Sequence, residues 1–210
     1  MTEIARPKPR GIYLFTAFER FWHWFQAVLI IFLLVSGFEI HGFYSLLGFE
    51  RAVNLHVLAA FTLLVLWMFA IFWHFVTGQW RHYVPSTHQM WATILFYTFG
   101  IFFGAPHPFR PTTKRKHNPL QAMAYFGFKV AMAPAAWISG LLLWGYGMFP
   151  DLYPGDLPVL WVNAMHIAAA FLIAAFLIAH LYLITTGETV TAQLRAMITG
   201  WDAFGGEEKD

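Results

Sequence analysis

The chain has 210 residues, of which 59% are hydrophobic, 20% are aromatic and only 11% are charged. Soluble domains carry roughly a quarter charged residues, so this composition excludes an ordinary soluble protein and predicts that lipid covers much of the surface. The formal charge of +2 is small, and we expect no nucleic-acid partner. The chain has no cysteine, which excludes iron–sulfur clusters, disulfides and covalently attached haem.

Four segments are apolar enough, and at about 20 residues or more long enough, to cross the hydrocarbon core of a bilayer as helices. In chain order they are roughly Phe18–Ile40, Val53–Val76, Ala124–Phe149 and Val159–Ile184. A fifth uncharged run, Met90–Gly104, is only about 15 residues long, which favours a helix at the membrane interface over a span. We therefore expect an all-α membrane protein, a four-transmembrane-helix bundle with an interfacial helix between the second and third spans.

The distribution of charge predicts the orientation of these spans. Basic residues gather before the first span and between the second and third, at Arg6, Lys8, Arg10, Arg20, Arg81, Arg110, Lys114, Arg115 and Lys116. The other two connections hold only one basic residue, Arg51, together with Asp151 and Asp156. The positive-inside rule then places both termini in the cytoplasm. A fifth span at Met90–Gly104 would move the second basic region outside, which argues against it.

Two helix ends carry recognisable signals. Thr77-Gly78 follows the second span, and glycine is the usual residue just past a helix C-terminus. Asn118-Pro119-Leu120-Gln121 opens the third span with an N-cap residue, a proline at the first helical position and a glutamine three residues after the cap.

Histidines are the candidate functional residues, because an ionisable side chain inside a span is costly and usually functional. Six of the ten lie within or at the ends of spans, namely His23, His41, His56, His74, His166 and His180. His166 and His180 are 14 residues apart, so on one helix they point within about 40° of each other and lie roughly 21 Å apart along its axis. Two histidines on one face at two depths predict two stacked haems.

Each haem then needs a sixth ligand at the same depth from another helix. His23 and His74 are level with His180 near the cytoplasmic side, and His41 and His56 are level with His166. The 18-residue spacings of His23–His41 and His56–His74 imply about 27 Å, too long for either helix to match both ligands of the fourth span. The first and second spans must therefore each supply one ligand. Two choices are open: His23 with His56, or His41 with His74.

The pattern Glu19-Arg20-Phe21-Trp22-His23-Trp24, followed by His56 and by His166 and His180, resembles the bacterial di-haem cytochrome b subunits. This group, of the cytochrome b-561 type, serves formate dehydrogenases, nickel–iron hydrogenases and thiosulfate reductases. Within this group the chain looks most like the thiosulfate-reductase type. Four further stretches carry that resemblance: His74-Phe75-Val76-Thr77-Gly78-Gln79-Trp80, Lys116-His117-Asn118-Pro119-Leu120-Gln121, Thr185-Thr186-Gly187-Glu188 and Met197-Ile198-Thr199-Gly200-Trp201.

The resemblance implies two haem b groups, with His56 and His166 holding an outer haem and His23 and His180 an inner one. It also implies a quinone, ubiquinone or menaquinone, beside the inner haem, where Asn118 contributes. Formate-dehydrogenase members have a glycine two residues after that asparagine, whereas this chain has Leu120. From the sequence itself, Arg20 lies one turn before His23, placed either to meet a haem propionate bidentately or to serve as an interfacial arginine.

The resulting hypothesis is a bacterial inner-membrane electron-transfer subunit, with residues 1–204 as a single domain and 205–210 as a disordered tail. It relays electrons between quinone and a periplasmic partner, either a multihaem cytochrome c or a molybdenum or iron–sulfur subunit. The chain would thus be the cytochrome b subunit of a multi-subunit oxidoreductase, with no catalytic residue of its own. Two alternatives remain open: a self-contained quinone-linked oxidoreductase such as a superoxide oxidase, and a haem-free protein whose histidines relay protons.

Overall fold

A computed structural model describes residues 11–152 and 157–203, so the predicted tail at 205–210 lies outside the described residues. The α-helices are α1 (Ala17–Ile40), α2 (Phe49–Thr77), α3 (Met90–Thr98), α4 (Pro119–Gly127), α5 (Ala133–Met148), α6 (Leu157–Ile184) and α7 (Ala192–Thr199). Shorter elements are the strands β1 (Ile12–Tyr13) and β2 (Trp201–Asp202), the π-helical turn Phe128–Met132 and the 3₁₀ turns Gln79–Tyr83, Gly100–Phe103 and Pro150–Leu152.

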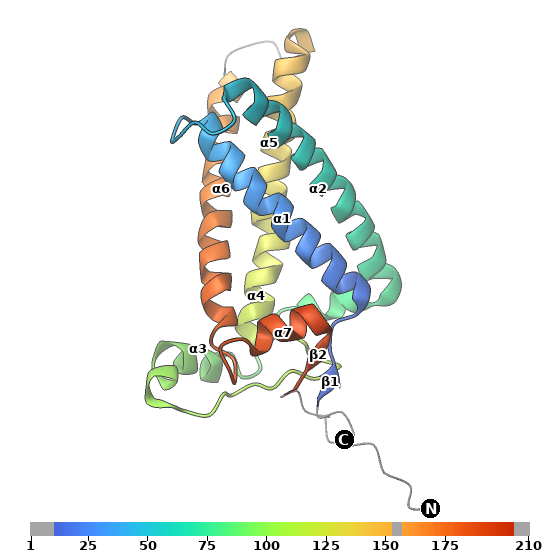
Figure 1. The fold of residues 1–210 in the computed structure, drawn as a ribbon, viewed down its shortest axis with the longest axis vertical. Coiled ribbons are helices and arrows are strands. Elements are labelled where there is room, and N and C mark those ends of the chain that lie inside the picture. The colour runs from blue at the N-terminus through green and yellow to red at the C-terminus, as the bar shows by residue number, and fades with distance from the viewer. Residues whose placement is uncertain (1–10, 153–156, 204–210) are drawn as a thin grey trace, which may run out of the picture. The chain divides into compact units, whose positions relative to one another are not determined.

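Among the described residues, four helices are long and apolar enough to cross a membrane: Ala17–Ile40, Phe49–Thr77, Pro119–Met148 and Val159–Ile184. They coincide with the four predicted spans to within a few residues, and the short helix α3 lies between the second and third of them in the chain (Figure 1). The predicted fold class is therefore confirmed.

The described residues form two compact units. The helical unit comprises residues 21–81 and 124–180, and thus most of the four spans. The terminal unit comprises residues 11–20, 82–123 and 181–203. That residues 1–204 form a single domain stays a prediction.

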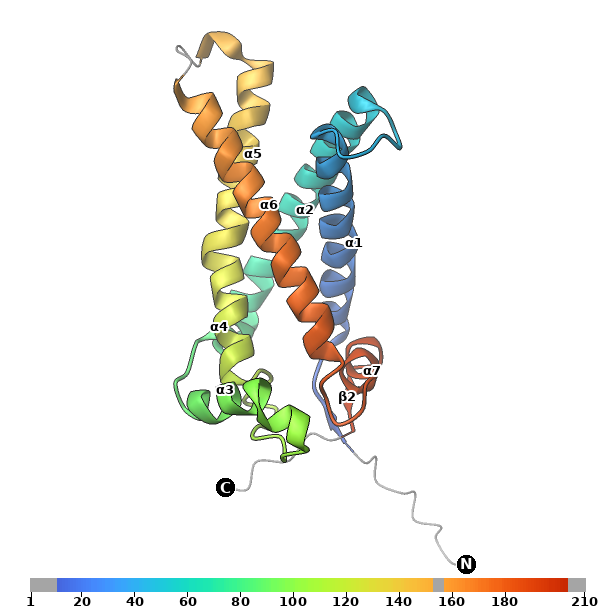
Figure 2. The same cartoon turned by 90° about the vertical axis from the view of Figure 1, so that its left-hand side faces the viewer.

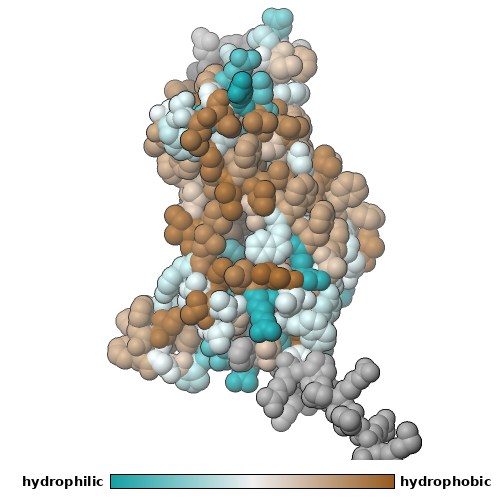
Figure 3. Space-filling view, viewed as in Figure 1, coloured by the Kyte–Doolittle hydropathy of each residue, from teal (hydrophilic) through white to brown (hydrophobic). Residues whose placement is uncertain are grey.

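Within the helical unit, small and aliphatic side chains pack between the helices. Its buried apolar residues are Trp22, Ala52, Ala59, Leu63, Leu66, Ala70, Ala133 and Ala169. Larger apolar side chains point outward, among them Val28, Leu58, Phe69 and Ile178, and hydrophobic side chains cover much of the face in Figure 3. The C-terminal ends of α1 and α5 lie at the same end of this unit (Figure 2). An apolar exterior over a core of small residues suits lipid as the solvent.

The third span contains an irregularity that the sequence analysis did not anticipate. The π-helical turn Phe128–Met132 joins α4 to α5, and Pro134 lies in the first turn of α5. Proline has no N–H to donate and its ring crowds the carbonyl four residues earlier, so a regular helix cannot continue through it unchanged. A wider turn just before the proline relieves that conflict. Pro134 is the sequence signal that could have predicted this feature.

In the terminal unit, the two ends of the described chain pair with each other. β1 and β2 form an antiparallel pair with Ile12 opposite Asp202 and Tyr13 opposite Trp201. The rings of Tyr13 and Trp201 lie 5.3 Å apart. Gly200, which ends α7 with a φ of 89°, has no room for a side chain, because a Cβ there would lie 2.5 Å from the Tyr13 ring. Glycine is thus required at this position by both conformation and space.

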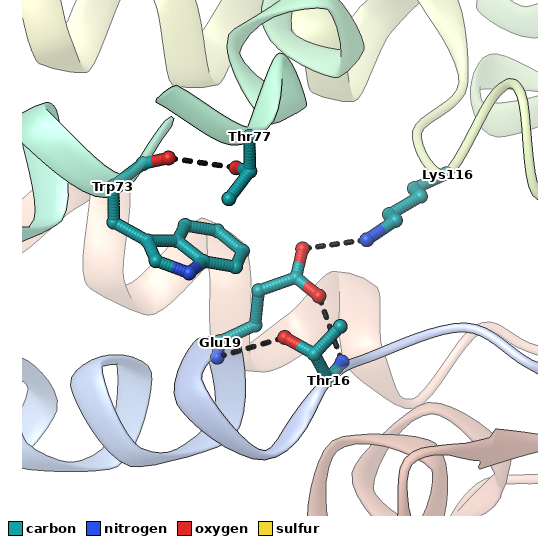
Figure 4. A network of polar contacts seen from close by, with 5 residues as sticks. All are labelled: Thr16, Glu19, Trp73, Thr77 and Lys116. Atoms are coloured by element: carbon teal, nitrogen blue, oxygen red, sulfur yellow. Dashed lines mark hydrogen bonds and ion pairs between the residues drawn. The ribbon is translucent and has the colours of Figure 1, made fainter. Parts of the chain in front are cut away.

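The first turn of α1 is held by a capping box. The hydroxyl of Thr16 accepts the backbone N–H of Glu19 at 3.3 Å, and the Glu19 carboxylate accepts the N–H of Thr16 at 2.8 Å (Figure 4). The other carboxylate oxygen of Glu19 accepts a charged hydrogen bond from Lys116, 97 positions later in the chain. The segment before α4 is thereby fixed to the start of α1.

Candidate metal centre

His56 on α2 and His166 on α6 face each other within the helical unit. Their ring centroids lie 6.3 Å apart with an interplanar angle of 70°. We call them the outer pair, after the side of the membrane on which the sequence analysis places them. Both side chains are half-buried.

His23 on α1 and His180 on α6 face each other in the same way and are called the inner pair. Their centroids are also 6.3 Å apart, with an interplanar angle of 56°. The ring of Phe176 stacks beside His180 at 6.1 Å with an interplanar angle of 4°, and Tyr125 meets it edge-on at 6.2 Å. Both histidines are half-buried.

The spacing within each pair fits a single metal ion between two imidazoles. A metal–imidazole bond is about 2 Å long and the ring centre lies roughly 1.1 Å behind the nitrogen, so two rings on one metal should have centroids about 6.2 Å apart. In both pairs the ring centroids lie 6.3 Å apart. Rings in direct contact would be free to approach more closely, since aromatic pairs pack with centroids from about 4.5 Å.

The donor set fits haem rather than a bare metal ion. Among residues 11–152 and 157–203, no three histidine, aspartate or glutamate side chains are grouped closely enough to hold a metal ion. Protein-only zinc sites need three or four ligands. Two opposed imidazoles complete a metal's coordination when a macrocycle supplies the remaining ligands, as in haem.

The outer pair has hydrogen bonds that the inner pair does not share. Nδ1 of His56 lies 2.9 Å from the hydroxyl oxygen of Ser36 on α1, and Nδ1 of His166 lies 3.0 Å from that of Ser139 on α5. Nδ1 of His23, by contrast, is buried without a hydrogen-bond partner among the described residues. The sequence analysis missed both serines. Each belongs to a Ser-Gly dipeptide, which occurs twice in the chain, once in the first span and once in the third.

The rival histidines, His41 and His74, have different surroundings. His41 is exposed and interacts electrostatically with both His56 and His166. His74 is buried, with Nδ1 2.6 Å from the carbonyl oxygen of Ala70 on its own helix and its ring edge-on to Trp22 at 5.4 Å. The rings that face His180 and His166 are those of His23 and His56, which is the first of the two choices left open by spacing. Ligation of iron by His23, His56, His166 and His180 stays a prediction.

Arg20 lies in the terminal unit, with Nη1 donating to the carbonyl oxygen of Ile198 at 2.6 Å. A cation at this position stabilises the C-terminal turn of α7, whose last carbonyls have no partner within the helix. Its Nε is buried without a hydrogen-bond partner among the described residues. Contact between Arg20 and a haem propionate stays a prediction.

Asn118 caps α4, as the sequence predicts. Its Oδ1 accepts the N–H of Gln121 at 2.8 Å, and the Gln121 side chain accepts the N–H of Asn118 at 3.1 Å. Its amide nitrogen lies 3.3 Å from the hydroxyl of Tyr97 on α3. Burial raises the pKa of Tyr97, and hydrogen bonds with Thr186 and Asn118 act in the opposite direction. Asn118 is 1% exposed, so contact with a quinone stays a prediction and would require this network to open.

The chain matches a known protein family and several known proteins. Residues 14–200 match the family described as "Prokaryotic cytochrome b561". The chain is similar to the "Putative cytochrome YdhU" of Escherichia coli strain K12, with 34% identity over 90% of this chain and 74% of the relative. It is also similar to the "Probable Ni/Fe-hydrogenase B-type cytochrome subunit" of Azotobacter vinelandii, with 25% identity over 97% of this chain and 93% of the relative.

A third relative is the "Probable Ni/Fe-hydrogenase 1 B-type cytochrome subunit" of Escherichia coli strain K12, 26% identical over 81% of each chain. No solved structure matches. None of these three relatives is described as a thiosulfate-reductase subunit, so that subtype stays a prediction. The family match nevertheless covers nearly the whole chain, including all four histidines of the two pairs. We conclude that the chain belongs to the prokaryotic cytochrome b561 family, a family of membrane electron-transfer cytochromes that carry haem b.

Proposed function

We propose that this cytochrome carries two haem b groups and relays single electrons between quinone and a redox partner at the periplasmic face. His56 and His166 would hold the outer haem, and His23 and His180 the inner one. The haem iron would supply the redox chemistry when bound, and the protein would tune it through these histidines and their surroundings.

The observation that carries the proposal is the equal spacing of the two imidazole pairs, whose ring centroids lie 6.3 Å apart in each pair, close to the value of about 6.2 Å expected of two ligands on one metal. α6 contributes one member to each pair, and these two members lie about 21 Å apart along its axis. That distance is most of the roughly 30 Å hydrocarbon core. An electron passing from one pair to the other would therefore cross much of the membrane.

The orientation proposed here places the inner pair at the cytoplasmic side. Four spans put the segments before α1 and after α6 on one side of the membrane. The basic residues of the α2–α4 connection, among them Arg110 and Arg115, belong on that same side, and the positive-inside rule makes it the cytoplasm. The outer pair then faces the periplasm, where an electron-exchanging protein partner would dock.

Quinone is the proposed partner at the inner pair because an electron carrier buried in lipid must exchange electrons with a lipid-soluble molecule or a docked protein. The family resemblance points to the segment before α4, where Asn118 lies. Other members of the family include proteins named as cytochrome subunits of nickel–iron hydrogenases, which supports a role as a subunit beside a separate catalytic protein.

The experiment is a haem count on the purified protein and four variants. The pyridine haemochrome assay should give a b-type spectrum with two haems per chain. His56→Ala and His23→Ala should each retain one haem, because each removes one histidine of one pair. His41→Ala is the matched control and should retain two haems, since His41 is exposed.

The double variant His166→Ala/His180→Ala should bind no haem, because α6 contributes to both pairs. A single haem in the unaltered protein would contradict the proposal of two. Absence of any haem would favour the haem-free proton relay, and a reduced-minus-oxidised visible spectrum would show that result at once.

A further inference from the structure

We infer that Ser36 and Ser139 are positioning residues for the outer haem: each accepts the Nδ1–H of one outer-pair imidazole and thereby leaves Nε2 as the ligating nitrogen. This inference rests on the proposed function, because it assigns a role toward a haem held by His56 and His166. It concerns only residues of the helical unit.

The direction of each hydrogen bond follows from where the serine hydrogen goes. The Ser36 hydroxyl donates to the carbonyl oxygen of Phe32 at 2.8 Å, and the Ser139 hydroxyl donates to that of Ala135 at 2.5 Å. A hydroxyl has one hydrogen, and in both residues it is directed at a carbonyl four residues earlier on the same helix. The oxygen can then only accept from a nearby imidazole, so Nδ1 must be the protonated nitrogen.

A second acceptor fixes the same tautomer independently. Nδ1 of His166 lies 3.1 Å from the carbonyl oxygen of Ala136, and His56 makes a hydrogen bond with the backbone of Leu33. Backbone carbonyls only accept hydrogen bonds. In each case the carbonyl belongs to the residue three positions before the serine. Both serines are completely buried, so water does not compete for these contacts.

The glycine after each serine faces the imidazole, and at Gly140 the lack of a side chain gives the ring room that a Cβ would take. A Cβ built on Gly37 would lie 3.4 Å from Cε1 of His56, and one built on Gly140 would lie 3.1 Å from Cε1 of His166. The Ser-Gly pair therefore holds the ring from two sides, through a hydrogen bond at Nδ1 and close contact at Cε1. The same Ser-Gly arrangement occurs twice, on α1 against His56 of α2 and on α5 against His166 of α6.

The predicted consequence is a difference between the two haems. Metal-ligating histidines usually donate their second N–H to an acceptor, which fixes the ring and raises the basicity of the ligating nitrogen. A more basic ligand favours ferric over ferrous iron, because it stabilises the higher charge. Removing a serine hydroxyl should therefore raise the midpoint potential of the outer haem and leave the inner haem unchanged.

The test is redox potentiometry and low-temperature EPR spectroscopy of the purified holoprotein. Ser36→Ala, Ser139→Ala and the double variant are compared with Ser36→Cys and Ser139→Cys, which roughly keep the side-chain volume but have a weakly accepting sulfur. Thr62→Ala is the matched control, because the half-buried Thr62 hydroxyl also donates four residues back, to the carbonyl oxygen of Leu58 at 2.8 Å, and lines an apolar pocket with Leu58, Val65 and Phe69.

The inference predicts that the alanine and cysteine variants all raise the potential of one haem and alter one low-spin EPR signal, with Thr62→Ala like the parent protein. Loss of that one haem in both alanine and cysteine variants would also support it. Cysteine variants that behave like the parent would show that the serines act by packing and would overturn it, as would alanine variants with two unchanged haems. If the parent protein itself lacked haem, the proposed function would fail first and the inference with it.

Discussion

Nζ of Lys116 lies 2.6 Å from Oε1 of Glu19, and the two side chains are only 7% and 6% exposed. This pair joins residues 97 positions apart and lies in the terminal unit, beside the capping box at Thr16. A buried ion pair contributes little net stability, but removing one partner leaves the other charge buried alone.

We therefore expect Lys116→Met to lower the free energy of unfolding by about 3–5 kcal/mol. Glu19→Gln should also destabilise, and the double variant Glu19→Gln/Lys116→Met should lose less than the sum of the two single changes. Thermal denaturation in detergent, followed by tryptophan fluorescence, measures this coupling. Additive losses would mean that the two charges do not interact energetically.

The second prediction concerns topology. A reporter fused after Asp210 should be active only in its cytoplasmic form, and one inserted after Asp151, between α5 and α6, only in its periplasmic form. The physical reason is the concentration of basic residues on one side of the four spans. Lys114 is exposed, so its labelling from the periplasm in intact cells would reverse the proposed orientation or require a fifth span.

The third prediction separates the two roles of Asn118. Asn118→Ala removes the N-cap of α4 and should cost about 1 kcal/mol of stability. Asn118→Asp keeps the capping oxygen but loses the amide donor to Tyr97. If Asn118 also serves quinone, both variants should slow haem reduction by quinol while both haem spectra stay intact. Quinol kinetics equal to those of the parent protein in both variants would leave Asn118 as a helix cap only.

The fourth prediction tests the glycines of the outer site. Gly37→Ala should be neutral or stabilising, because its Cβ meets His56 at an ordinary distance and alanine gains up to about 1 kcal/mol in a helix. Gly140→Ala places its Cβ 3.1 Å from His166 and should destabilise by about 1–3 kcal/mol of overpacking, with an altered outer-haem EPR signal. Equal behaviour of the two variants in thermal denaturation would contradict this difference.

The fifth prediction concerns His74. Because its Nδ1 already bonds the carbonyl of Ala70 and its ring packs against Trp22, His74→Ala should retain two haems and lose stability through packing alone. The haemochrome assay and thermal denaturation measure the two effects separately. A variant that lost one haem, with His23→Ala keeping both, would move the inner ligand from His23 to His74.

The spans and their caps were predictable because the signals are local. A run of about 20 apolar residues defines a membrane helix without reference to any other segment. The capping box of Asn118 and Gln121 and the left-handed glycine at Gly78 likewise depend only on neighbouring residues, and both occur as predicted. The interfacial helix α3 followed from length and charge alone.

The candidate site was predictable only in part. Spacing along each helix left two choices for the partners of His166 and His180, because spacing does not give the rotation of one helix against another. The contacts of Ser36 and Ser139 depend on that rotation and were not anticipated. The pairing of Glu19 with Lys116 was missed for a related reason, since nothing local connects residues so far apart in the chain.

The pairing of β1 with β2 has a consequence for biosynthesis. Ile12 pairs with Asp202, and Arg20 donates to the carbonyl oxygen of Ile198. A ribosome makes the N-terminal members of these contacts first and their partners last. All four spans are thus synthesised before these contacts can form, and their closure should be among the last steps of maturation. A chain stalled during translation before Ile198 would carry four complete membrane helices, and the start of α1 would have its capping box and Lys116 but not its contacts with α7 and β2.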